Sequence, residues 1–157
     1  MQLASSMMRT MQKVEVVRRI SAPIEKVWAC YTDHRGWVRF LGAGKITLDP
    51  EGTPTADGVG CVRHIQVAGI EMVAEEVTVF EPPHRMKYRI VRGGGPFRDH
   101  DGEVLFEQEE GGTKVTWRCE FVSLIPGLGP LFALGVKRVF GLVLQGVERQ
   151  LLQQQRS

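Results

Sequence analysis

The residues best suited to chemistry include a histidine flanked by carboxylates. His100 lies in the run Arg98-Asp99-His100-Asp101. A histidine next to carboxylates can act as a general base near neutral pH. The same run also fits a solvated loop, so His100 is a candidate catalytic residue and no more than that.

Arg63 is a second candidate because it occupies the apolar register of a strand predicted over residues 61–67. Cys61, Ile65 and Val67 share its parity. A guanidinium on the inner side of a sheet is costly to bury unless a carboxylate pairs with it. The predicted turn Ala68-Gly69 brings the next strand alongside and supplies that carboxylate.

Two glutamates, Glu75 and Glu76, compete for the role of partner to Arg63. Alternation along the strand does not decide between them, since Val73, Val77 and Val79 place Glu75 inward while Met72 and Phe80 place Glu76 inward. An Arg–Glu pair at a solvated rim is the alternative interpretation.

Other chemical motifs are missing from the sequence. It contains no nucleophile elbow and no glycine-rich phosphate loop between a strand and a helix. Cys30, Cys61 and Cys119 have no metal-ligand spacing, and their apolar neighbours predict reduced, buried thiols. We therefore predict neither a metal nor a cofactor.

The element that must position these side chains is a long helix predicted over residues 130–155. Its apolar residues recur at steps of three and four, namely Phe132, Val136, Val139, Phe140, Val143, Val147 and Leu151. Gly135 and Gly146 lie near one edge of that face. Their missing side chains fit either close packing against the sheet or room for a ligand.

Strands dominate the rest of the chain. One strand and two short helical pieces come first, the second piece carrying Trp37, and about six strands with turn-rich connections follow. Alternation places Tyr88 and Trp117 on the inner face. Without strand–helix alternation in the middle, the predicted class is α+β: a curved antiparallel sheet of about seven strands around the C-terminal helix.

The 157 residues fit one domain, predicted over 13–157, with residues 1–12 as a disordered extension. A net charge of +2 argues against nucleic acid as a partner.

The apolar region 124–144 is interrupted by prolines and by Lys137-Arg138, so it fails the test for a membrane span of about 18 residues. These features predict a soluble cytoplasmic protein. Its oligomeric state, including a homodimer, stays open.

Several local motifs resemble the START-like (SRPBCC, helix-grip) superfamily, and its polyketide cyclase/dehydrase-like group in particular. The motifs are Ser21-Ala22-Pro23-Ile24-Glu25-Lys26-Val27-Trp28, Glu75-Glu76-Val77 with Glu81-Pro82-Pro83, Tyr88-Arg89-Ile90, and Gly111-Gly112-Thr113-Lys114-Val115-Thr116-Trp117. The resemblance implies a sheet gripping the helix around an apolar cavity. It also favours Glu76 as the inward glutamate.

Two functions follow from that resemblance. The first is binding of a hydrophobic or aromatic small molecule, either a lipid or a polyketide-like compound. The second is a cofactor-independent cyclase, aromatase or dehydrase, with His100 and Glu76 as the candidate acid–base residues. The residues expected to line the ligand site are Trp37, Arg63, Glu76, Tyr88, His100, Trp117, Val136, Phe140 and Val143.

Overall fold

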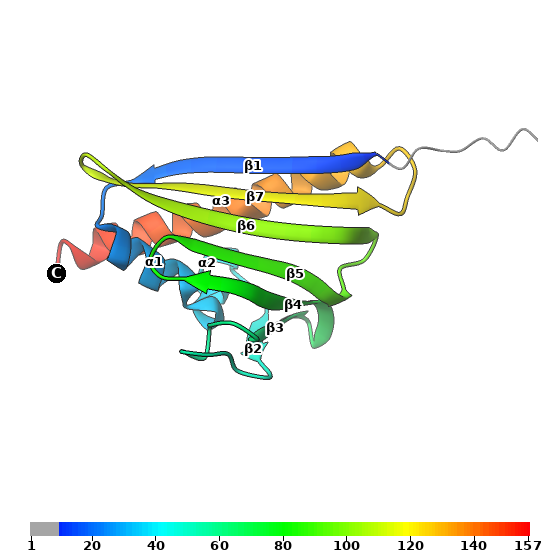
Figure 1. The fold of residues 1–157 in the computed structure, drawn as a ribbon, viewed down its shortest axis with the longest axis horizontal. Coiled ribbons are helices and arrows are strands. Elements are labelled where there is room, and N and C mark those ends of the chain that lie inside the picture. Colours follow the sequence, from blue (N-terminus) through cyan, green and yellow to red (C-terminus); the bar gives the residue numbers. More distant parts are fainter. Residues whose placement is uncertain (1–9) are drawn as a thin grey trace, which may run out of the picture.

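A computed structural model describes residues 10–157 of the chain. An N-terminal strand is followed by a short helical segment, a run of six strands and a long helix (Figure 1). The helical elements are α1 (Ile24–Thr32), the 3-10 helix η1 (His34–Trp37), α2 (Val38–Leu41) and α3 (Gly129–Gln154). The strands are β1 (Met11–Ile20), β2 (Lys45–Leu48), β3 (Val62–Val67), β4 (Ile70–Glu81), β5 (Arg85–Gly93), β6 (Phe97–Glu109) and β7 (Gly112–Ser123).

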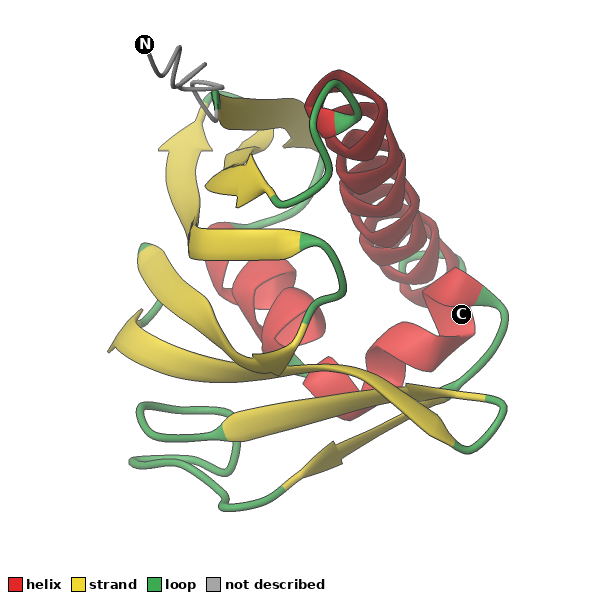
Figure 2. Cartoon of the chain, turned by 90° about the vertical axis from the view of Figure 1, so that its right-hand side faces the viewer, coloured by secondary structure: helices red, strands yellow, loops and turns green. Residues whose placement is uncertain are grey.

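The strands form one antiparallel sheet in the order β1-β7-β6-β5-β4-β3-β2. Strand β1 therefore pairs with β7 although the two strands are the first and the last along the chain. The sheet curls, and α3 runs along its concave side (Figure 2). The predicted α+β class is confirmed, with seven strands and the long C-terminal helix within residues 10–157.

Helix α3 begins where the sequence predicts, with Pro130 in its first turn, a position at which a missing N–H costs nothing. By length and composition alone, α3 is long and apolar enough to cross a membrane. The sequence does not predict this property, because the apolar region 124–144 is interrupted. In the structure its buried residues lie in the core, against the sheet and α1. We therefore assign α3 as the core helix of this fold.

The N-terminal boundary differs from the prediction. Strand β1 begins at Met11 and pairs with β7 from that residue onward, so Met11 and Gln12 belong to the domain. Residues 1–9 of the predicted disordered extension lie outside the described residues. An ion pair between Arg18 of β1 and Glu148 then ties this edge strand to α3.

The fully buried core lies around the C-terminal half of α3. Its helical side chains there pack against α1 and the inner face of the sheet, and they are Val143, Leu144, Val147 and Leu151. Burying each of these side chains contributes about 1.5–3 kcal/mol. The N-terminal half of α3 is different, since Leu131, Leu134 and Val139 remain exposed there.

Candidate functional site

A cavity of about 620 Å³ lies between the N-terminal half of α3 and the inner face of the sheet. Most of its walls are aliphatic or aromatic. The polar exceptions within the described chain are Glu75 from β4, Tyr88 from β5 and His100 from β6. An apolar cavity with a few convergent polar groups is the usual form of a small-molecule site.

One face of α3 forms one wall of the cavity. The cavity-lining residues of α3 recur along successive helical turns: Leu131, Phe132, Gly135, Val136, Val139 and Phe140. A Cβ added at Gly135 would meet no atom within 4 Å. Gly135 therefore leaves open space beside the cavity, which agrees with its interpretation as room for a ligand.

A distortion of β6 directs His100 into the cavity. The pairing of β6 with β7 shifts register between Arg98 and Asp101, and Asp99 has a positive φ of 53°. Such bulges bend a strand and re-aim one side chain. The His100 ring stands 5.4 Å from the Tyr88 ring, centroid to centroid.

His100 is neutral at ordinary pH and has unused hydrogen-bonding capacity. Burial lowers its pKa below the usual value, although the nearby Glu75 carboxylate opposes that shift. Its Nδ1 is buried and has no hydrogen-bond partner anywhere in residues 10–157. A buried, unpartnered ring nitrogen at a cavity wall is suited to bind a ligand atom.

Tyr88 is held as a protonated phenol. Burial, followed by the Glu75 carboxylate, raises the pKa of Tyr88 well above its usual value. The indole Nε1 of Trp117 donates to the Tyr88 oxygen over 2.8 Å, and this leaves the hydroxyl hydrogen to be donated elsewhere. The ring lies over Gly102, where an added Cβ would stand 2.3 Å from the Tyr88 Cζ atom.

The third polar group, Glu75, is paired with a buried arginine. Arg63 Nη2 donates to Glu75 Oε2 over 2.8 Å. The Arg63 Cζ atom also lies 4.6 Å from the Tyr88 ring centroid and 5.0 Å from that of Trp37. Desolvation is the largest single influence and lowers the pKa of Arg63, but Glu75, Tyr31, Tyr88 and Cys61 together outweigh it, so the pKa is raised.

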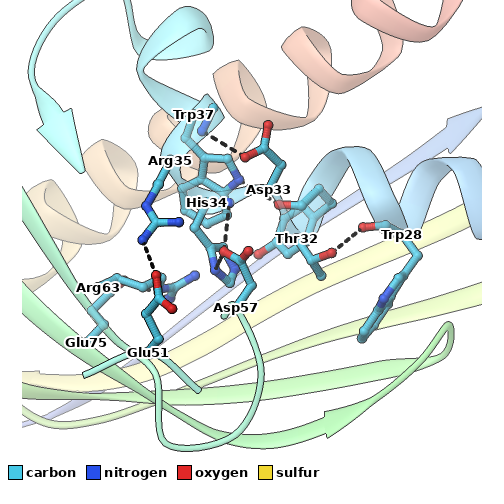
Figure 3. Close-up of polar contacts among 12 residues, drawn as sticks. Trp28, Thr32, Asp33, His34, Arg35, Trp37, Glu51, Asp57, Arg63 and Glu75 are labelled. Carbon is cyan, nitrogen blue, oxygen red and sulfur yellow. Dashed lines mark hydrogen bonds and ion pairs between the residues drawn. The ribbon is translucent and has the colours of Figure 1, made fainter. Parts of the chain in front are cut away.

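A polar cluster stands behind Arg63, away from the cavity lining. His34 Nδ1 lies 2.8 Å from Asp57 Oδ1, and the His34 ring packs edge-on against Trp37 (Figure 3). Burial, and then the charge of Arg63, lowers the pKa of His34 to about 4. This cluster anchors the loop 49–61 to η1, since Arg35 also pairs with Glu51 of that loop.

The prediction of Glu76 as the inward glutamate is wrong. Its Oε2 accepts hydrogen bonds from Arg89 at 3.0 and 2.8 Å, and Glu76 does not line the cavity. Glu75 stands opposite Arg63 in the β3–β4 pairing. Two register shifts in β4, at Ala74/Glu75 and Val77/Val79, explain why the alternation gave conflicting answers.

Three further expectations also need correction. Arg63 is buried but does not border the cavity, so it contacts the glutamate and not the cavity space. Val143 belongs to the closed core instead of the cavity wall. Gly146 packs against Phe40, whose ring atoms would lie 2.3 Å from an added Cβ, so close packing is its role.

The other predicted lining residues, Trp37, Tyr88, His100, Trp117, Val136 and Phe140, do border the cavity. The lining residues missed by the sequence include Leu41 and Met72, and the connection 94–96 between β5 and β6 borders the cavity as well. The run Gly93-Gly94-Gly95-Pro96 was the available signal for that connection. The loop after Leu48 does not line the cavity.

Comparison with protein families gives one match. The family described as polyketide cyclase / dehydrase and lipid transport matches residues 11–152. No curated protein sequence matches the chain. Solved structures match the fold of this chain, and their sequence identities of 17–20% support a shared fold alone.

Three solved structures represent that likeness. The Zhui aromatase/cyclase from Streptomyces sp. R1128 has a TM-score of 0.73 at 20% identity, over 90% of this chain and 96% of that one. Ara h 8.0201 has a TM-score of 0.70 at 17% identity, over 92% and 99%. The di-domain ARO/CYC BexL of the BE-7585A biosynthetic pathway has a TM-score of 0.68 at 20% identity, over 88% of this chain and 49% of that one.

Proposed function

Since the chain belongs to the polyketide cyclase / dehydrase and lipid transport family, we propose that it binds a hydrophobic, ring-containing small molecule. The ligand, a polyketide-like compound or a lipid, occupies the cavity between α3 and the sheet. We place this activity in a soluble, cytoplasmic protein.

The observation that carries the proposal is the composition and size of the cavity. Its volume of about 620 Å³ falls within the range of roughly 300–1,000 Å³ common for small-molecule sites. Aromatic walls from Trp37, Trp117, Phe132 and Phe140 favour a flat ring. The aromatase/cyclase activity named for the Streptomyces structure supports a polyketide-like ligand over a simple lipid.

The test is a fluorescence titration with the uncharged dye N-phenyl-1-naphthylamine. Wild type should bind the dye with enhanced emission. Gly135→Phe should reduce the affinity at least about tenfold, because a phenyl group added at Gly135 occupies the cavity.

Gly141→Phe provides the matched control. A Cβ at Gly141 also meets nothing within 4 Å, and Gly141 does not border the cavity. This variant should bind the dye like wild type. If wild type does not bind, or if both variants lose affinity equally while folded, the cavity is not the binding site.

A cofactor-independent cyclase is the second candidate function, and the neutral, unpartnered His100 beside Tyr88 favours it. His100 would remove a proton from a methylene carbon between two carbonyl groups. The resulting enolate carbon would attack a second carbonyl carbon within the same substrate. Tyr88 would donate to the developing oxyanion, and loss of water would complete the ring.

Binding and catalysis are separated by the variant His100→Gln. For catalysis, this variant should still bind a poly-β-ketone thioester and should lose at least about a hundredfold of the cyclisation rate at saturating substrate. The products are followed by mass spectrometry as the loss of one water. If wild type binds the thioester without accelerating its cyclisation, the protein acts by binding alone.

A further inference from the structure

We propose that the cavity selects uncharged ring compounds bearing a hydroxyl group and rejects carboxylates, with Glu75 accepting the ligand's hydroxyl hydrogen. This inference rests on the proposed function, because it concerns the specificity of the same cavity. Three features of the polar end of the cavity carry it.

The first feature is the unequal use of the two Glu75 oxygens. Oε2 accepts from Arg63, whereas Oε1 has no hydrogen bond within residues 10–157. Because Glu75 borders the cavity, this oxygen is an acceptor available to a ligand. A ligand hydroxyl can donate to it, while a ligand carboxylate would be repelled by a like charge at short range.

The second feature is the position of the positive charge. Arg63 is buried and outside the cavity lining; its Nη2 donates to Glu75, the guanidinium lies against the faces of Trp37 and Tyr88, and Nε and Nη1 are buried with no hydrogen-bond partner in residues 10–157. No lysine or arginine in the described part of the chain borders the cavity. An anionic ligand therefore meets no accessible cation. A cationic ligand gains little, since Arg63 already balances the charge of Glu75.

The third feature is the neutral pair Tyr88 and His100, 5.4 Å apart between ring centroids. The Tyr88 oxygen already accepts from Trp117, so its hydroxyl hydrogen is the group left to interact with a ligand. The buried Nδ1 of His100 can donate or accept according to its tautomer. Together with Glu75 they fit a ring hydroxyl and a neighbouring carbonyl oxygen.

The experiment compares three ligands of one ring size: naphthalene, 2-naphthol and 2-naphthoate. Each is titrated at pH 7 as a competitor of N-phenyl-1-naphthylamine. For wild type, 2-naphthol should bind about tenfold tighter than naphthalene, the effect of one well-placed hydrogen bond to a charged acceptor. The carboxylate should bind at least about tenfold more weakly than naphthalene.

Two variants and a control assign the selectivity to Glu75. Glu75→Gln should lose the rejection of 2-naphthoate, because Arg63 is then left without its carboxylate. Arg63→Met with Glu75→Gln removes both charges, which leaves no unpaired buried charge, and should bring the three affinities within about threefold. Glu76→Gln is the control, because Glu76 pairs with Arg89 and does not border the cavity. Its selectivity among the three ligands should equal that of wild type.

The outcomes distinguish this inference from the proposed function. If wild type binds neither the dye nor any naphthalene, the proposed function fails and this inference with it. If wild type binds naphthalene but holds 2-naphthoate equally or more tightly than 2-naphthol, the inference alone is overturned. It is overturned as well if Glu76→Gln and Glu75→Gln change the selectivity alike.

Discussion

The two halves of α3 share one apolar periodicity and serve opposite purposes. In the C-terminal half, Val143, Leu144 and Val147 are fully buried against the sheet and α1. In the N-terminal half, Leu131 and Val139 remain exposed along the cavity wall. The apolar periodicity of a helix therefore does not indicate whether the rest of the protein covers that face or leaves it open.

The two glycines near the edge of the stripe show the same division. Gly146 lets Phe40 of α2 approach the helix, whereas Gly135 faces open space at the cavity. The adjacent glutamates of β4 show a similar contrast. Glu75 forms a buried ion pair with Arg63, and Glu76 forms an exposed ion pair with Arg89. Substitutions in the two glycines and in the two ion pairs can therefore test how the packed region differs from the cavity region.

The largest effect is expected from the two ion pairs. Arg63→Met leaves Glu75 without its buried counter-charge and should lower the free energy of unfolding by about 3–5 kcal/mol. Arg89→Met breaks the exposed pair and should cost less than about 1 kcal/mol. Urea denaturation measures both values. Equal losses in the two variants would show that the Arg63–Glu75 pair is not buried in solution.

The second effect concerns pH and compares His34, in the packed region, with His100 at the cavity. The pKa of His34 is about 4 in the folded protein and about 6.5 when unfolded, so the unfolded state binds more protons between these values. Stability should therefore fall as the pH drops below about 6.5. The loss at pH 5 relative to neutral pH is about 2 kcal/mol from His34 alone.

His34→Gln should remove most of that pH dependence, whatever its own cost in stability. His100→Gln should remove less of it, because His100 is less enclosed. Denaturation at pH 7 and at pH 5 gives the slope for each variant. An unchanged slope in His34→Gln would contradict a neutral, buried His34 beside Asp57 and Arg63.

The smallest effect distinguishes the two glycines by the sign of the stability change. Gly135→Ala adds a methyl group in open space and should stabilise the helix by up to about 1 kcal/mol. Gly146→Ala forces Phe40 to move and should destabilise by about 1–2 kcal/mol after the same helical gain is subtracted. Thermal denaturation resolves the opposite signs. Stabilisation by both variants would mean that α2 does not pack on α3 as described.

Regular elements could be predicted from the sequence, whereas their irregularities could not. The helix over 129–154 and the alternation from Val115 to Phe121 follow from side-chain period, since one face of each is buried. The register shifts in β4 have no such signal, and they decided between Glu75 and Glu76. Parity counting fails wherever a bulge inserts one residue.

Contacts between distant segments limited the prediction of the site in the same way. The space that Gly146 provides is used by Phe40, and the space beside Gly135 is not used by protein, yet both are glycines on one helix edge. Arg63 was correctly expected to be inward, but its exclusion from the cavity depends on Trp37 and Tyr88 flanking the guanidinium. Packing among three distant side chains leaves no trace in local periodicity.

The most direct test is to locate a bound ligand by NMR, using protein with labelled valine methyl groups and unlabelled 2-naphthol. We predict intermolecular NOEs from the naphthol ring to Val136 and Val139 in the N-terminal half of α3, and none to Val143 or Val147. NOEs confined to valines outside the cavity, such as Val17 on β1, would contradict the account.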